Sequence, residues 1–99
     1  MNIYKSSGLY IGFILQDNFF RWDGKYLGWL DNQNFIWDKD GNFRGQLVEK
    51  NGNHYALKNS FQIPPVSKPA RPVPVTPIPP TPSGPVSPIS LPIGEEDAF

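Results

Sequence analysis

The side chains able to do acid–base or metal chemistry are few and scattered in this sequence of 99 residues. His54 is the only imidazole, and cysteine is absent. One histidine makes neither a metal cluster nor, without a positioned nucleophile and an orienting group, a hydrolase. Asp23, Asp31 and Asp40 fall at predicted turns, where an aspartate side chain bonds its own backbone. We therefore expect structural roles for all of them, with no catalytic residue, no cofactor and no enzymatic activity.

The stretch "DKDGNFRGQLVE" carries oxygen-bearing side chains at the spacing of a calcium loop. Asp38, Asp40, Asn42 and Glu49 match loop positions 1, 3, 5 and 12. The glycine required at position 6 is replaced by Phe43, and the flanking residues have the pattern of strands instead of helices. A β-hairpin explains the same residues, so we expect no metal site.

Aromatic side chains are the other group with binding potential, and twelve of the fourteen precede residue 61. They form either a hydrophobic core or a surface on which sugars, peptides or single-stranded bases stack. The candidate binding surface comprises Trp22, Tyr26, Trp29 and Trp37.

The segments that position these aromatics repeat along the chain. Copies begin at Asn2, Asn18 and Asn34, and a degraded fourth copy begins at Asn53. Each of the first three places Ser-Gly or Asp-Gly between aromatic-rich runs, which is a β-hairpin signal. A period this regular indicates a repeat architecture, here an all-β fold of four consecutive β-hairpins. The structural glycines are Gly8, Gly12, Gly24, Gly28, Gly41 and Gly45.

The first glycine of each pair is expected in a turn with positive φ, and the second at a bend point inside a strand. In the third copy Lys39 reads as an additional loop residue, which leaves Phe35 facing Gly45. In the fourth copy the alignment predicts that His54 faces Ile63.

Composition changes abruptly after the repeats, because all twelve prolines lie between Pro64 and Pro92. Proline removes backbone donors and fixes φ, so this segment is expected to be extended polyproline II. The sequence predicts a repeat domain over residues 1–62 and a proline-rich tail over residues 63–99, ending in the acidic, Phe-terminated "GEEDAF".

A candidate recognition motif lies in the tail. Arg71, Pro74 and Pro77 fit the R-x-x-P-x-x-P form, in which prolines fill aromatic-lined grooves and the basic residue sets the orientation. The alternative is a linker or tail without a binding role.

The charge and hydropathy of the chain limit the classes of partner that we expect it to bind. Nine basic and nine acidic side chains give zero net charge, so we expect no binding to duplex nucleic acid. No apolar run approaches the ~20 residues of a membrane span, and no secretory signal is evident. We expect a cytoplasmic protein that does not associate with membranes.

The hairpins "IYKSSGLYIGFI", "FRWDGKYLGWL" and "DKDGNFRG", followed by the "KPARPVPVTP" tail, resemble the bacterial four-fold β-flower proteins. This resemblance implies four hairpins arranged with pseudo-four-fold symmetry. It implies no activity.

The predicted sheet is apolar on both faces, whereas a face in contact with water would alternate polar and apolar residues. Another segment must therefore cover the second face. We hypothesise that the tail lies on the exposed Trp and Tyr side chains, in cis or from a neighbouring subunit. The predicted function is a non-enzymatic binding or scaffold module. Its partner is either an unknown protein or a second copy of the chain bound through the tail, which would form a homo-oligomer. The alternative is a carbohydrate- or cell-wall-binding module that stacks sugars on the repeat aromatics.

Overall fold

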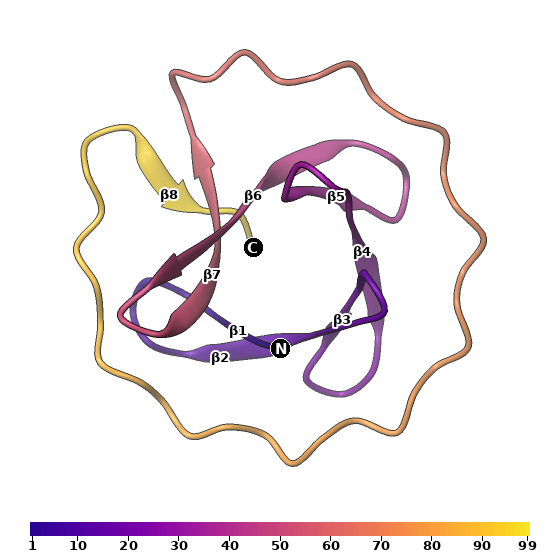
Figure 1. Ribbon diagram of the computed structural model, residues 1–99, viewed down its shortest axis with the longest axis horizontal. Helices are drawn as coiled ribbons and strands as arrows, with labels where there is room; N and C mark the ends of the chain where they lie inside the picture. Colours follow the sequence, from indigo (N-terminus) through magenta and orange to yellow (C-terminus); the bar gives the residue numbers. More distant parts are fainter.

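The fold, described over residues 1–99 by a computed structural model, is a single closed β-sheet without helices (Figure 1). The strands are β1 (Asn2–Tyr4), β2 (Tyr10–Leu15), β3 (Asn18–Arg21), β4 (Tyr26–Leu30), β5 (Phe35–Asp38), β6 (Phe43–Lys50), β7 (Asn53–Asn59) and β8 (Glu95–Asp97). Consecutive strands pair in sequence order, and a parallel pairing between β1 and β7 closes the sheet. No element is a helix that could cross a membrane.

Three hairpin loops of identical construction project from the sheet. The loops are Lys5–Leu9, Arg21–Lys25 and Asp38–Asn42. In each, the first N–H donates to the fifth carbonyl and the glycine N–H donates to the first carbonyl. Gly8, Gly24 and Gly41 have φ values of 91°, 91° and 88°, a region that favours glycine because it has no Cβ. The Ser-Gly and Asp-Gly dipeptides therefore form the turns that the sequence predicts.

The expected pairing of Phe35 with Gly45 is wrong by one residue, because Gly45 faces Ile36. Lys39 is not an additional loop residue, since the third loop has the same length as the other two. The extra residue lies before β5. Phe19 of β3 follows Gly12 by seven positions, whereas Ile36, the equivalent residue of β5, follows Gly28 by eight.

The second glycine of each pair is required by the next hairpin along the chain. A Cβ on Gly12 would collide with the carbonyl oxygen of Phe20, and a Cβ on Gly28 would collide with that of Trp37. Each glycine thus lets the neighbouring strand approach closely.

The fourth hairpin is built differently from the prediction. β7 pairs with β8, and the N–H of Ala98 donates to the carbonyl of Ala56 at 2.9 Å. The expected contact between His54 and Ile63 is therefore wrong, and Ile63 is exposed. Residues 60–94, here called the strap, form the long loop of this hairpin.

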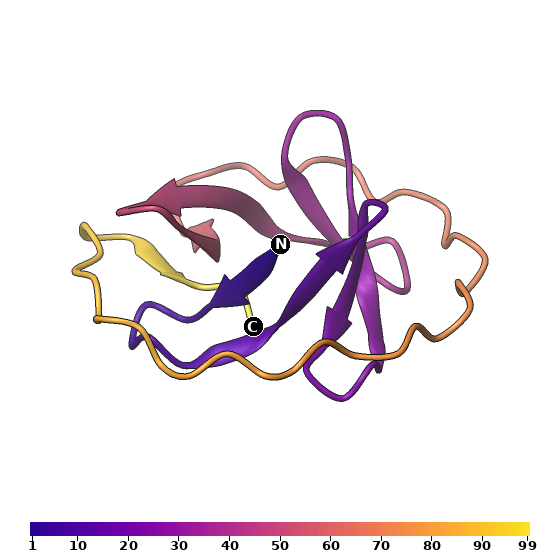
Figure 2. The same cartoon turned by 60° about the horizontal axis from the view of Figure 1, so that its bottom comes forward.

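The strap runs around the outside of the strands as a ring, as Figures 1 and 2 show. The boundary predicted at residue 62 does not divide the structure, because β8 and Ala98 belong to the repeat domain. The Cα radius of gyration of 13.1 Å equals that of a compact domain of about 100 residues, so the strap adds no extended arm.

The core lies on the pseudo-four-fold axis and takes one fully buried residue from each hairpin. These residues are Ile3, Phe19, Ile36 and Ala56. Ala98 joins the same cluster, and the ring of Phe99 packs edge-on against Phe19 with centroids 5.0 Å apart. Phe99 is partly buried, so the C-terminal residues of the chain complete one side of this core.

Candidate functional site: the strap interface and the Trp22 pocket

The structure divides the predicted aromatic surface into buried and open parts. Trp29 and Trp37 are buried, with nearly parallel rings whose centroids lie 6.5 Å apart. Tyr26 is half-buried, whereas Trp22 keeps 51% of its surface exposed. The four side chains therefore do not form one platform.

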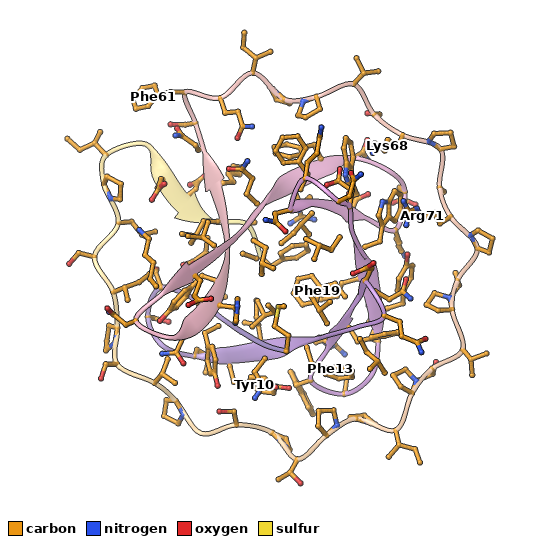
Figure 3. The ribbon with its side chains drawn as sticks, in the orientation of Figure 1. Tyr10, Phe13, Phe19, Phe61, Lys68 and Arg71 are labelled. Carbon is orange, nitrogen blue, oxygen red and sulfur yellow. The ribbon has the colours of Figure 1, made fainter.

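Two cations of the strap cover the buried tryptophans. The ammonium nitrogen of Lys68 lies 4.8 Å from the ring centroid of Trp37, and the guanidinium carbon of Arg71 lies 4.8 Å from that of Trp29. Figure 3 shows both side chains on the inner side of the strap, whereas Phe61 points outward. A cation over an aromatic face contributes about 0.5–2 kcal/mol, depending on how far water is excluded.

Asp31 connects the strap to the turn before β5. Its carboxylate accepts hydrogen bonds from the backbone N–H groups of Gln33 and Phe35, from Nε1 of Trp37 at 2.9 Å and from Nζ of Lys68 at 3.4 Å. The Asp31 side chain is 6% exposed, and burial alone would raise its pKa, but these hydrogen bonds outweigh that effect and lower the pKa. The sequence predicts the turn role of Asp31 and not its bonds to Trp37 and Lys68.

The strap is anchored on two hairpin loops by backbone hydrogen bonds. The N–H of Lys68 donates to the carbonyl of Gly41 at 2.9 Å, and the N–H of Val86 donates to that of Gly8 at 3.0 Å. Pro77 lies midway between these anchors, nine residues from each, and passes over the remaining loop, Arg21–Lys25, at Gly24. Proline has no N–H, so the equivalent bond cannot form at Gly24.

The anchored loops leave no space for a side chain at their glycines. A Cβ on Gly41 would collide with the carbonyl oxygen of Lys68, and one on Gly8 would collide with that of Val86. At Gly24 the nearest strap atoms would be 3.3 Å away, so the strap passes this loop at a greater distance.

The end of the strap is attached through a second apolar cluster. Val86, Ile89 and Leu91 pack against buried residues of the first and fourth hairpins, which are Tyr4, Tyr10, Tyr55 and Leu57. The hydroxyl of Tyr4 also lies 2.7 Å from that of Ser83. Burial of Tyr10 raises the pKa of its hydroxyl, and the neighbouring Tyr4 adds to this shift.

The candidate tail motif lies on the inner side of the strap. Arg71 covers Trp29, and Pro74 and Pro77 are half-buried. Residues three apart share one face of a polyproline II helix, which has three residues per turn. The motif therefore faces its own domain and not a solvent-accessible partner.

One apolar pocket remains open on the domain, here called the Trp22 pocket. Its volume is 370 Å³, and its lining residues are Leu9, Tyr10, Ile11, Arg21, Trp22, Leu27, Arg44 and Phe99. Six of these eight are hydrophobic, so the pocket suits an apolar group.

Two arginines border the Trp22 pocket, and both are already engaged. Arg21 bonds both carboxylate oxygens of Asp23, which lowers the pKa of Asp23 to about 2. Arg44 donates to the carbonyl of Ala98 at 2.8 Å and covers the ring of Phe99 at 4.4 Å. Sequence reasoning missed Arg44 and Phe99, because only the return of the chain through β8 brings them together.

The residues weighed for catalysis or metal binding lie in structural positions. Nε2 of His54 is 3.4 Å from the Glu49 carboxylate across the β6–β7 pair, at the sheet surface. The Asp38 carboxylate accepts the N–H groups of Asp40 and Asn42 and so closes its own loop. The structure contains no group of three or more His, Cys, Asp or Glu side chains able to hold a metal ion.

Comparison with known proteins agrees with this architecture. No curated protein and no solved structure matches the chain. The family model described as 4-fold beta flower protein matches residues 1–92, which include the three regular hairpins, β7 and most of the strap. The chain therefore belongs to the 4-fold beta flower protein family.

Proposed function

We propose that this protein is a non-enzymatic binding module and that its free binding surface is the Trp22 pocket. The observation that carries the proposal is the exposed indole of Trp22 beside a 370 Å³ apolar pocket. Ligand pockets typically measure about 300–1,000 Å³ and combine apolar walls with a few polar groups. Leu9, also exposed, extends the apolar rim.

The composition of the pocket favours a protein partner. Tryptophan, tyrosine and arginine are the residues that most often carry binding energy in protein interfaces. All three types line the pocket, and Arg21 and Arg44 are held in place by Asp23 and Ala98. Side chains fixed in this way lose little entropy when a partner binds.

A carbohydrate ligand is the second candidate, and Trp22 is also the observation that favours it. Stacking of sugars on several repeat aromatics would need Trp29 and Trp37, which the strap covers. A sugar site is therefore restricted to Trp22 and its immediate neighbours.

The test is a selection of random displayed peptides on the immobilised full chain, followed by calorimetric titration of the selected peptides. Trp22→Ala is expected to weaken binding at least tenfold, which corresponds to about 1.4 kcal/mol. Phe61→Ala is the matched control, because Phe61 is also an exposed aromatic but lies outside the pocket.

Three outcomes contradict the proposal of a peptide-binding pocket. They are the absence of any selected peptide, unchanged affinity in Trp22→Ala, and an equal loss in the Phe61→Ala control. Retention on insoluble polysaccharide that disappears in Trp22→Ala would support the carbohydrate candidate instead.

A further inference from the structure

The middle of the strap, here called the free span, is held by backbone hydrogen bonds at its two ends and only by side-chain contacts between them. No backbone hydrogen bond joins the strap to the domain between the anchors at Lys68 and Val86. Within this span the Arg71 guanidinium covers Trp29, the Ser83 hydroxyl lies beside that of Tyr4, and the side chains of Thr76 and Pro79 pass close to Gly24. The segment is thus kept extended, and its outer side stays exposed.

The outer side of this span carries a row of exposed, mostly apolar side chains, here called the outer ridge. The half-buried residues of the span are Pro74, Pro77, Pro79 and Ser83, which form its inner side. The outer ridge consists of exposed residues at a spacing of three, namely Pro72, Val75, Ile78 and Thr81. Val75 is 92% exposed and Ile78 is 96% exposed, although both are large aliphatic side chains.

We infer that this outer ridge is a docking surface for a protein with an aromatic-lined groove that takes polyproline II segments. Such grooves gain affinity because the ligand is already extended and has little entropy to lose. Here the anchors on Gly41 and Gly8 add to that preorganisation. The surface is separate from the Trp22 pocket, so the inference goes beyond the function proposed above.

The absence of charge on the outer ridge indicates which kind of groove can bind it. Residues 72–82 contain no charged side chain, and the nearest cation, Arg71, is turned onto Trp29. Recognition is therefore independent of an acidic residue in the partner, unlike recognition of an R-x-x-P-x-x-P motif. Val75 and Ile78 supply the contacts, while Arg71 does not.

The test is titration of the full chain with purified SH3, WW and EVH1 domains as probes, with amide NMR spectra to check that each variant is folded. At least one class of probe is expected to bind, and the double variant Val75→Ser/Ile78→Ser is expected to weaken it at least tenfold. Ile93→Ser is the matched control, because Ile93 is 93% exposed on the strap but lies outside the free span. Arg71→Gln is expected to leave the affinity within about twofold of the wild type.

The inference is overturned if none of the three classes binds, or if Ile93→Ser weakens binding as much as the double variant. A tenfold loss in Arg71→Gln with a preserved spectrum would show that the inner face is the one recognised. If light scattering shows self-association that the double variant abolishes, while no probe binds, the ridge contacts a second copy of this chain and the inference is also overturned.

Discussion

The N–H of Ala98 donates to the carbonyl of Ala56 at 2.9 Å, which joins the last strand of the chain to the fourth hairpin. This bond places Ala98 in the core beside Ile3 and Phe19. The strap must therefore travel around the whole domain before the core is complete. Strap and domain form one folding unit, although their compositions differ sharply.

The first prediction concerns removal of the strap. A chain that ends at Gln62 lacks Ala98 and Phe99 and uncovers Trp29 and Trp37. Exposure of a large apolar side chain costs about 1.5–3 kcal/mol, and two such losses take a large part of the usual 5–15 kcal/mol of stability. We expect the truncated chain to lose its amide dispersion in two-dimensional NMR spectra. A dispersed spectrum like that of the full chain would contradict this expectation.

Much of the repeat domain is predictable from its sequence because its signals are local. Ser7-Gly8 and Asp23-Gly24 produce the expected loops, and the alternating aromatics produce the expected strands. The register of the third hairpin is not predictable by alignment, because the four-residue spacing from Gly41 to Gly45 is preserved while the extra residue precedes β5.

The fourth hairpin and the strap interface depend on contacts between distant residues. β8 has the sequence Glu-Glu-Asp, which has low intrinsic preference for strands, and it forms because the docked strap returns it to β7. Arg71 is recognisable as a polyproline-motif residue, but which side of the strap faces inward is fixed by the anchors of Lys68 and Val86. The amino-acid composition of the strap does not indicate which of its sides faces the domain.

The second prediction compares two glycines with similar backbone conformation. Gly41 has φ 88° and touches the strap, whereas Gly52 has φ 80° and no atom within 4 Å of a Cβ. An alanine at either position costs about 1–2 kcal/mol of backbone strain. Gly41→Ala also displaces the strap and its hydrogen bond from Lys68, which adds about 1–3 kcal/mol.

Urea denaturation measures the difference between these two variants. Gly41→Ala is expected to have a clearly lower midpoint than Gly52→Ala with a similar slope. Equal midpoints would mean that the contact between Gly41 and the strap contributes nothing to stability, and would contradict the role of Gly41 as an anchor.

The third prediction concerns the acid sensitivity of Asp31. Its pKa is lowered in the folded protein, so the stability it contributes is present above the unfolded value of about 4 and is lost as the pH falls through the folded value. Asp31→Asn removes the charge from the hydrogen bonds to Trp37 and Lys68. A hydrogen bond to a charged group contributes about 1.5–3 kcal/mol. We expect a loss of about 2–3 kcal/mol at pH 7 and a flatter decline of stability below pH 4.

Asp23→Asn is the control for this variant, because the pKa of Asp23 is also lowered, to about 2, but its partner Arg21 is at the surface. Exposed ion pairs contribute little, so Asp23→Asn is expected to shift the urea midpoint far less than Asp31→Asn. Tryptophan fluorescence provides a second readout, since loosening of Lys68 exposes Trp37 and shifts its emission to the red. If both variants unfolded at the same urea concentration across pH 2–7, Asp31 would act as a turn residue alone and the strap would be held by Gly41 and Gly8 without it.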